Sequence, residues 1–266
     1  MSVPVAVTVA GSDSGGGAGI QADLKAFSAN GVYGASVIAA LTAQNTRGVQ
    51  AIHDVPADFI AAQIDSVFSD FAVDATKIGM LSRAPAIAAV ADGLVRHGAK
   101  NIVLDPVMVA TSGDRLLAAD AVDALRRRLF PLAAVVTPNL QEAAALPDGD
   151  LAAGAAEMLA QARALLAMGP AAVLIKGGHG AGPEAVDILA TPGGALRFSA
   201  PRIDTPNTHG TGCTLSAAVA AGLAAGLPLT DAVRKAKNYV HGAIAAAHRL
   251  GIGHGAGPTH HFHEWW

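Results

Sequence analysis

A stretch of glycines and one cysteine, residues 207–216 (NTHGTGCTLS), is the part of the chain best suited to chemistry. Gly210 and Gly212 let the backbone approach a ligand closely, because glycine has no Cβ. The small apolar run that follows predicts a helix whose first N–H groups have no partners within it and therefore attract an anion. Cys213, the one cysteine of the chain, falls in the first turn of that helix. Because the positive end of the helix dipole favours a thiolate, the pattern predicts a lowered pKa for Cys213.

These residues leave two interpretations of the stretch open. In the first, a phosphate pocket and a candidate base share one turn. In the second, a glycine-rich turn leads into a buried alanine-rich helix, and Cys213 is a small inert core residue, as cysteine often is.

A second glycine-rich stretch, residues 11–19 (GSDSGGGAG), follows a β-branched run over residues 3–10. A strand, a glycine loop and a helix in this order are typical of a ligand-binding site. The loop is not a Walker A motif, because Gly17 stands where that motif requires lysine. Residues 17–22 fit a loose dinucleotide pattern, but the next predicted strand ends at Gln44 and Asn45, with no carboxylate to hold a ribose, which argues against NAD.

The elements that must position these stretches alternate along the chain. Apolar runs predict strands over residues 3–10, 35–42, 49–55, 75–78, 101–104, 134–137 and 171–175. Helical spacing predicts helices over residues 20–30, from Pro56 onward, over 84–97 and 119–129, in the region up to Met168, and over 212–225 and 230–250. Residues 185–190 and 195–199 predict a small β-hairpin. The sequence therefore predicts an α/β fold, a mostly parallel sheet with helices on both faces, in a single domain over residues 1–266.

Polar or special residues stand where the predicted strands end. They are Gly11 with Asp13, Gln44, Met80, Asp105, Asn139 and Lys176. Because parallel α/β sheets bind ligands outside the carboxyl ends of their strands, we expect these residues to face one crevice together with the Cys213 turn.

Each of the polar candidates at the strand ends can be explained either by a role in ligand binding or by a purely structural role. Lys176, before two glycines, could reach a phosphate or could simply begin a surface loop. Asn139 and Glu142, three residues apart, form either a capping box or a contact to Mg²⁺ and nucleotide phosphate. Asp105, before Pro106, could organise a metal or initiate a turn.

Three other features are weighed in the same way. The amide of Gln44 matches the edge of an aminopyrimidine or a pyridoxal-like ring, although a loop glutamine is often merely solvated. Asp23 follows the glycine loop, and periodicity does not decide whether it faces the crevice or solvent. His260, His261 and His263 could hold a metal, but a packed or interfacial tail fits adjacent histidines better.

Composition narrows the classes of function. Of 266 residues, 52% are hydrophobic and 15% charged, with 18 Lys and Arg against 21 Asp and Glu, so the chain shows no basic footprint for nucleic acid. One cysteine excludes an internal disulfide and suits a reducing cytosol. The longest apolar stretch, residues 217–229, is too short to span a membrane, and the N-terminus lacks the basic start of a signal peptide. We expect a soluble cytoplasmic protein that acts on a small molecule.

Several motifs together resemble those of one enzyme family. They are residues 10–25 (AGSDSGGGAGIQADLK), 43–48 (AQNTRG), 77–80 (KIGM), 137–142 (TPNLQE), 176–179 (KGGH), 207–216 and the ending 260–266 (HHFHEWW). Over essentially its whole length the chain resembles the hydroxymethylpyrimidine/phosphomethylpyrimidine kinases of thiamin biosynthesis, in the ribokinase-like superfamily. The resemblance implies the use of ATP and Mg²⁺, a parallel sheet covered on both faces, and a homodimer.

The resemblance also implies roles for individual residues. The pyrimidine would lie near Gly11, Asp23, Gln44, Met80 and Val107, the last through its backbone. The nucleotide would contact Asn139, Lys176 and Thr211, and the metal Glu142 and Asp105. Gly210, Thr211 and Gly212 would form the anion hole for the transferred phosphoryl group, with Lys176 beside it and Cys213 as the base. Sugar kinases of the superfamily carry aspartate at the position of Cys213, which argues against a sugar substrate.

The expected function is phosphorylation of 4-amino-5-hydroxymethyl-2-methylpyrimidine, and of its monophosphate to the diphosphate. A pyridoxal or pyridoxine kinase is one alternative, since some relatives that phosphorylate pyridoxal also use cysteine. A pyrimidine-binding sensor without catalysis is another.

Overall fold

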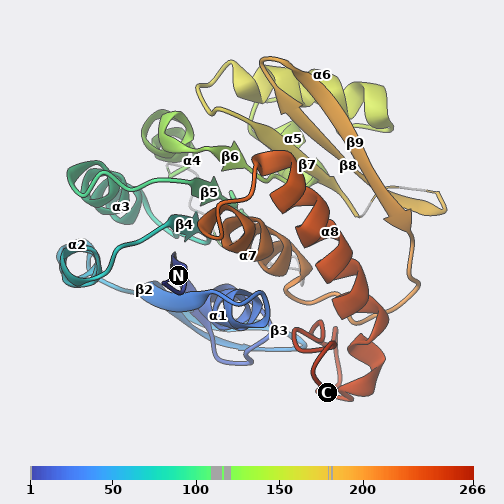
Figure 1. The fold of residues 1–266 in the computed structure, drawn as a ribbon, viewed down its shortest axis with the longest axis horizontal. Coiled ribbons are helices and arrows are strands. Elements are labelled where there is room, and N and C mark those ends of the chain that lie inside the picture. The colour runs from blue at the N-terminus through green and yellow to red at the C-terminus, as the bar shows by residue number, and fades with distance from the viewer. Residues whose placement is uncertain (1, 109–115, 117–120, 179, 181) are drawn as a thin grey trace.

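The computed structural model describes residues 2–108, 116, 121–178, 180 and 182–266. One sheet runs through this part of the chain in the order β3-β2-β1-β4-β5-β6-β7-β8-β9 (Figure 1). The strands are β1 (Val5–Asp13), β2 (Tyr33–Asn45), β3 (Gly48–Asp54), β4 (Ala75–Ile78), β5 (Ile102–Leu104), β6 (Val135–Val136), β7 (Val173–Gly177), β8 (Glu184–Thr191) and β9 (Gly194–Pro201). Strands β2, β1, β4, β5, β6 and β7 pair in parallel, whereas β3, β8 and β9 are antiparallel to their neighbours.

Helices cover both faces of this sheet. They are α1 (Gly19–Ala29), α2 (Ala57–Asp70), α3 (Ala84–Arg96), α4 (Ala121–Ala124), α5 (Leu140–Ala145), α6 (Ala155–Leu166), α7 (Thr211–Ala224) and α8 (Leu229–Ala245). One apolar core joins the sheet to α2, α3, α5 and α6, and a second joins it to α1, α7 and α8. Helix α7 lies between the sheet, α1 and α8 (Figure 1). The prediction of a mostly parallel sheet with helices on both faces is confirmed, as is the hairpin of β8 and β9.

The first two strands are longer than the apolar pattern predicts. Strand β1 continues three residues past Ala10, because Gly11 to Asp13 pair with Ala40 to Thr42 of β2 after a shift in register. Strand β2 continues to Asn45 and forms a hairpin with β3. Asp13 and Gln44 are therefore held by the sheet and do not lie in free loops.

Only part of the helix predicted over residues 119–129 is an α-helix. Residues 119 and 120 lie outside the described residues, α4 covers the next turn, and Leu125–Leu129 form a π-helical turn. A short 3₁₀ turn, Phe130–Leu132, follows, because Pro131 cannot continue the helix.

The C-terminal tail returns to the start of the fold. The hydroxyl oxygen of Thr46, at the tip of the β2–β3 hairpin, lies 3.2 Å from the backbone nitrogens of both His254 and Gly255 and accepts their hydrogen bonds. Pro258 pairs with His209, just before α7. The tail therefore connects the β2–β3 hairpin with the turn that begins α7.

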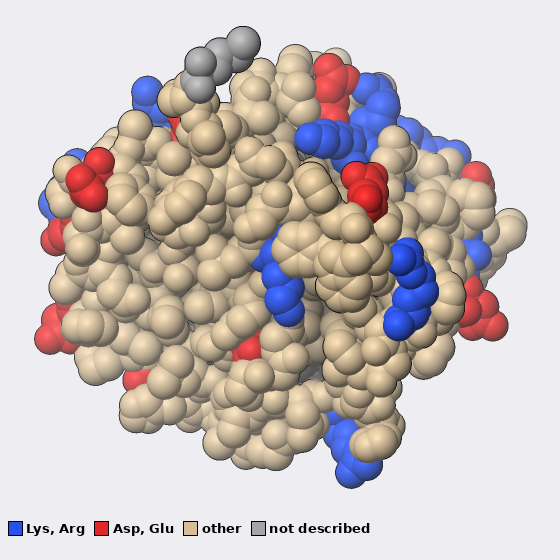
Figure 2. Space-filling model, turned by 60° about the horizontal axis from the view of Figure 1, so that its bottom comes forward, with Lys and Arg blue, Asp and Glu red and all other residues tan. Residues whose placement is uncertain are grey.

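Two further observations concern the surface and the helices. Figure 2 shows one face of the molecule, on which acidic and basic side chains lie scattered among uncharged ones. Within the described part of the chain, no helix combines the length and the apolar character that crossing a membrane requires.

Candidate active site

We call the glycine-rich turn at the start of α7, residues 207–212, the anion turn, after the anion that it is predicted to bind. Gly210 has φ of 79°, in the left-handed region, and a Cβ there would overlap the carbonyl oxygen of Gly17. The hydroxyl of Thr211 donates to the carbonyl oxygen of Thr208 at 2.8 Å. Helix α7 begins at Thr211, so Cys213 lies in its first turn, as predicted. The first N–H groups of a 14-residue helix thus follow directly on the turn.

Lys176 stands over this turn. Its Nζ lies 3.3 Å from the position that a Cβ on Gly212 would take, and 2.5 Å from Oδ1 of Asp105. Asp105 also accepts hydrogen bonds from Thr137 and Ser216, each at 3.2 Å. The lysine side chain is only 12% exposed, so the interpretation as an ordinary surface lysine is wrong.

The ion pair fixes the charges of both partners. Burial favours neutral forms, but Lys176 and the nearby Lys77 outweigh it and hold the pKa of Asp105 below its usual range. Burial likewise opposes the charge of Lys176, whereas Asp105 and Glu142 raise its pKa. The anion turn therefore faces an ammonium group that keeps its proton.

Asn139 and Glu142 form the capping box that their spacing predicts. The Asn139 side chain accepts from the Glu142 N–H at 2.9 Å, and Glu142 Oε2 accepts from the Asn139 N–H at 2.8 Å. Burial raises the pKa of Glu142 to about 7, Lys176 works against this shift, and Asp105 adds to it. A capping residue with a carboxyl group that titrates near neutrality is compatible with a second role, which stays a prediction.

The prediction that the pKa of Cys213 is lowered is wrong. The residue is partly accessible, yet the dense protein around its thiol raises the pKa to about 11. Lys77 and a hydrogen bond from the Gly19 backbone N–H favour the thiolate, but the carboxylates of Asp23 and Asp105 oppose it. Loss of hydration and nearby negative charge outweigh the helix dipole.

Three of the residues expected at the pyrimidine lie near the carboxyl ends of parallel strands: Gly11 in β1, Met80 after β4 and Val107 after β5. The Met80 sulfur lies 3.3 Å from the position that a Cβ on Gly11 would take, and the Gly11 N–H donates to the Met80 carbonyl oxygen at 3.2 Å. The Val107 N–H donates to the Asp105 carbonyl oxygen at 2.8 Å, so a ligand contact through this backbone would use the Val107 carbonyl. Gly11 and Met80 are thus brought together, as predicted.

Asp23 faces neither solvent nor an open crevice. It is fully buried, and its Oδ2 accepts from Thr8 Oγ1 at 2.6 Å and from Lys77 Nζ at 2.9 Å. Its other carboxylate oxygen has no hydrogen-bond partner among the described residues. Burial raises the pKa of Asp23, while Lys77 lowers it.

Lys77 is a functional candidate that the sequence analysis missed. Its side chain is 0% exposed, and Asp23, Cys213 and Asp105 raise its pKa against the effect of burial. One signal was available: Lys77 is the only charged residue of a four-residue strand predicted to be buried on both faces.

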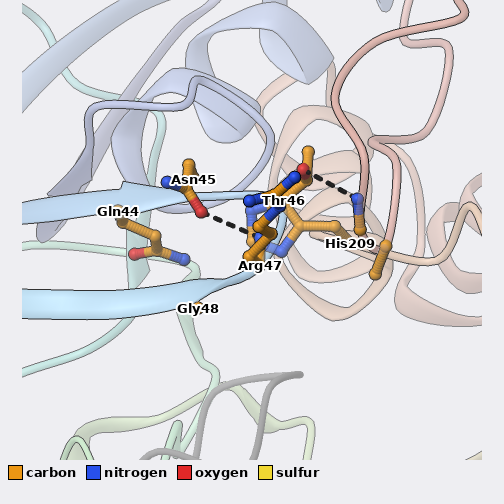
Figure 3. Close-up of a pocket in the computed structure, with 8 residues that line it drawn as sticks. Gln44, Asn45, Thr46, Arg47, Gly48 and His209 are labelled. Carbon is orange, nitrogen blue, oxygen red and sulfur yellow. Dashed lines mark hydrogen bonds between the residues drawn. The ribbon is translucent and has the colours of Figure 1, made fainter.

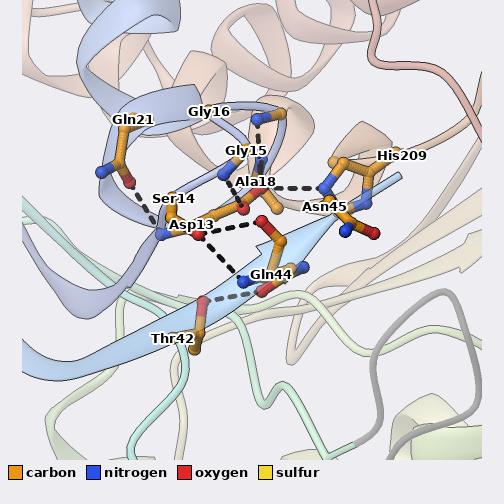
Figure 4. A network of polar contacts seen from close by, with 12 residues as sticks. Asp13, Ser14, Gly15, Gly16, Ala18, Gln21, Thr42, Gln44, Asn45 and His209 are labelled. Carbon is orange, nitrogen blue, oxygen red and sulfur yellow. Dashed lines mark hydrogen bonds and ion pairs between the residues drawn. The ribbon is translucent and has the colours of Figure 1, made fainter. Parts of the chain in front are cut away.

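Gln44 lies beside the glycine loop, at the end of β2. Its Oε1 accepts from Thr42 Oγ1 at 3.0 Å, and its backbone exchanges two hydrogen bonds with the Ser14 hydroxyl, at 2.8 and 2.9 Å (Figure 4). Among the described residues, no hydrogen bond links Gln44 directly with Cys213. The β2 end is therefore attached to the loop rather than to the anion turn itself.

A cavity of about 400 Å³ opens at the tip of the β2–β3 hairpin (Figure 3). The described residues that line it are Gln44, Asn45, Thr46, Arg47, Gly48, His209, Gly255 and Ala256. Of these, Gln44 is the one predicted to contact substrate. The β2–β3 hairpin thus borders a hollow that His209 and the C-terminal tail complete.

The histidine-rich ending is a packed tail, as predicted. His260 and His261 are buried, and His261 Nε2 lies 3.0 Å from Thr214 Oγ1 on α7. Burial and neighbouring positive charges lower the pKa of His261 to about 3. In the described ranges, no three His, Cys, Asp or Glu residues are grouped so as to hold a metal ion.

The doubly covered sheet, the anion turn at the start of a helix and the lysine–carboxylate pair beside it define a kinase of ribokinase-like fold. Residues 13–260 match the family model described as phosphomethylpyrimidine kinase, and the chain belongs to this family.

Sequence and structure comparisons agree with this assignment. The chain is 62% identical to a hydroxymethylpyrimidine/phosphomethylpyrimidine kinase of Rhizobium meliloti (strain 1021), over 98% of both chains. The structure of a phosphomethylpyrimidine kinase from Clostridium difficile 630 is 43% identical, with a TM-score of 0.80 over 91% of this chain and 99% of that one. An ADP complex of Bacillus subtilis pyridoxal kinase is 38% identical, with a TM-score of 0.89 over 98% of both chains.

Proposed function

We propose that this enzyme transfers the γ-phosphoryl group of ATP to 4-amino-5-hydroxymethyl-2-methylpyrimidine, and then to the monophosphate, giving the diphosphate used to make thiamin. The observation that carries the proposal is the placement of Lys176 over Gly212, in the turn that also holds Cys213. A cation, bare amides and a thiol at one point suit the transfer of a phosphoryl group to an alcohol.

The acceptor site is proposed on the side of β1, β2 and β4. Gly11 and Met80 would contact the pyrimidine ring, the amide of Gln44 would read its edge, and Val107 would contribute its backbone carbonyl. Asp23 is buried, and its Oδ1 has no hydrogen-bond partner within the described part of the chain, so it would act on the pyrimidine site through its ion pair with Lys77.

The nucleotide site is proposed on the side of β6 and β7. Asn139, Lys176 and Thr211 would contact the phosphates, and Asp105 and Glu142 would hold Mg²⁺. The fit is supported by two buried carboxyl groups that both act on Lys176, since Asp105 and Glu142 each raise the pKa of that lysine and Asp105 also raises the pKa of Glu142. Two such ligands suit Mg²⁺, which is usually held by one or two carboxylates together with water and substrate phosphates. When bound, Mg²⁺ neutralises charge on the phosphoryl oxygens.

The chain's own residues supply positioning and charge. In the first step the alcohol oxygen forms a bond to the γ-phosphorus while the bond from that phosphorus to ADP breaks. The alcohol proton passes to the small fraction of Cys213 that is ionised, because the raised pKa leaves most of this thiol protonated near neutral pH. Lys176 and the amides of residues 210–212 stabilise the negative charge on the transferred group. In the second step the acceptor is a phosphate monoester, whose second pKa is about 6, so it needs no base at neutral pH.

Replacing the thiol separates the two steps. We expect Cys213→Ala to lower phosphorylation of the alcohol much more than phosphorylation of the monophosphate, since only the alcohol loses a proton. Steady-state rates with each acceptor measure the effect. Equal losses in both steps would show that Cys213 is not the base.

The proposed activity is tested by analysing products with hydroxymethylpyrimidine, its monophosphate and pyridoxal in parallel, each with ATP and Mg²⁺. Formation of the pyrimidine diphosphate supports the proposal. Binding without turnover would support a sensor instead.

The assay includes pyridoxal because a pyridoxal kinase is among the proteins of similar structure. A rate with pyridoxal above that with the pyrimidine would make a vitamin B6 kinase the main activity.

We further propose that residues 1–266 act as one domain, in a cytoplasmic homodimer. The oligomeric state is measured by analytical ultracentrifugation.

A further inference from the structure

The carboxylate of Asp13 organises the glycine loop that follows β1. Oδ1 accepts from the Gly15 N–H at 2.8 Å, and Oδ2 accepts from the N–H groups of Gly17 at 3.0 Å and Ala18 at 2.8 Å. Burial works against its charge, but these backbone donors and a histidine hold the pKa of Asp13 below its usual range. A single buried anion thus folds residues 14–18 around itself.

The histidine comes from the other end of the chain. His209 Nε2 lies 2.8 Å from Asp13 Oδ2, and both side chains are less than a tenth exposed (Figure 4). Because the ionised carboxylate only accepts, Nε2 carries the proton and donates. His209 immediately precedes Gly210, so its ring connects the glycine loop with the anion turn.

The two loops also touch through their backbones. A Cβ on Gly210 would overlap the carbonyl oxygen of Gly17, and a Cβ on Gly17 would overlap the His209 ring. The His209 N–H donates to the Gly257 carbonyl oxygen at 3.0 Å, which holds its backbone from the opposite side. The ring is therefore fixed in place by the tail while its Nε2 holds Asp13.

We propose that Asp13 and His209 are positioning residues, whose hydrogen bond sets the loop beside the acceptor and the turn that receives the phosphoryl group at a fixed separation. The inference rests on the proposed function, because that reaction takes place between these two loops. Phosphoryl transfer needs its attacking and leaving oxygens in line, and a displacement of about 1 Å can lower the rate about 10²-fold.

The chain offers a matched pair of variants at position 209. In His209→Gln, the amide nitrogen is separated from Cα by as many bonds as Nε2 of histidine and can donate to Asp13. In His209→Asn, the same amide is one carbon shorter and does not reach. We expect the glutamine variant to keep most of the wild-type kcat and the asparagine variant to lose about 10²-fold.

Binding of the single substrates distinguishes misplacement from a damaged site. The dissociation constants of hydroxymethylpyrimidine and of a non-hydrolysable ATP analogue, measured separately by calorimetry, are expected to stay near wild type in His209→Asn. Each half of the site would be intact, and only their relative position would change. Loss of affinity in proportion to kcat, or equal kcat in the two variants, would overturn the proposal.

Hydrogen exchange provides a readout that does not depend on activity. The N–H groups of Gly17 and Ala18 share Oδ2 with His209, so they are expected to exchange faster in His209→Asn than in His209→Gln, at equal melting temperature. Unchanged exchange in both would refute the link between the loops. A wild-type enzyme that phosphorylated no pyrimidine would instead refute the proposed function and leave this result unaffected.

A third variant covers the case in which His209→Asn does not fold. Asp13→Asn keeps the size of the side chain but replaces one acceptor oxygen with an NH₂ group, which then faces N–H donors. The same loss of kcat with retained single-substrate affinity is expected. A wild-type kcat in a folded Asp13→Asn variant would contradict the proposal.

Discussion

The thiol of Cys213 provides a direct test of the electrostatics, because it is the one cysteine in the chain and can be titrated by alkylation. The surroundings raise its pKa from the ordinary value of 9.0 to about 11, a difference of two units. At pH 8 this lowers the thiolate fraction about a hundredfold, since each unit is a factor of ten. The rate of reaction with iodoacetamide follows the thiolate and should therefore rise steadily from pH 7 to pH 10.

Substitutions of two charged residues that act on the thiol, Lys77 and Asp23, should shift this titration in opposite directions. Lys77→Met removes the charge that most favours the thiolate, so the pKa rises and alkylation at pH 9 slows. Asp23→Asn removes an opposing charge while Asp105 still holds the proton on Lys77, so alkylation becomes faster. A nearby charge typically shifts a pKa by one unit or more, which corresponds to about a tenfold change in rate.

The assay includes its own reference. The same protein in urea exposes Cys213 to water and should titrate as an ordinary cysteine, and circular dichroism checks that each variant is folded. Wild-type alkylation with the pH dependence of an ordinary thiol would refute the role of burial. A shift of both variants in the same direction would show that they act by loosening the structure and not through charge. Lys176 and Asp105 also face the thiol and are unchanged in both variants.

Two further substitutions test the anion turn. Gly210→Ala should destabilise the fold by roughly 1–2 kcal/mol or more, because alanine resists the left-handed backbone and its Cβ would overlap the Gly17 carbonyl; a thermal melt that matches wild type would contradict this. Lys176→Met should lower kcat about 10²- to 10³-fold by removing the cation over the turn. Lys237→Met is its matched control, because it breaks an ion pair of similar length and exposure, to Asp187, but leaves Lys176 over the turn. If both lysine variants lost kcat equally, loss of a buried ion pair would explain the effect.

The sequence predicted the order of strands and helices because the apolar period changes clearly between them. The predicted ends of β1 and β2 both come too early. For β1 the reason is that Gly11, Ser12 and Asp13 have low strand propensity. Pairing with β2 overrides that local preference. Local patterns therefore predicted which elements exist, and neighbouring strands decided where they end.

The site was predictable where function depends on local spacing. The glycine-rich turn, Cys213 in the first helical turn and the capping box of Asn139 and Glu142 all lie within a few residues, and the structure has each of them, whereas anion binding at the turn stays a prediction. Lys176 was predictable because it ends a buried strand before two glycines.

Contacts between distant residues were not predictable in this way. Lys77 and Asp23 are 54 residues apart, and His209 and Asp13 are 196 apart, so no local period connects them. The sign of the Cys213 pKa shift was wrong for the same reason. The helix dipole can be inferred from the sequence, whereas burial and the carboxylates come from elements far along the chain.

The charges around the anion turn are balanced in pairs, which has a consequence for nucleotide binding. Lys77 is neutralised by Asp23, and Lys176 by Asp105, each at hydrogen-bonding distance. An unpaired buried charge would be costly, so the pairs stabilise the site before any substrate enters. A phosphate oxygen in the turn must then compete with Asp105 for the ammonium group of Lys176. Any cation that binds Asp105 would release Lys176 to the phosphate, so metal and nucleotide should bind more tightly together than apart.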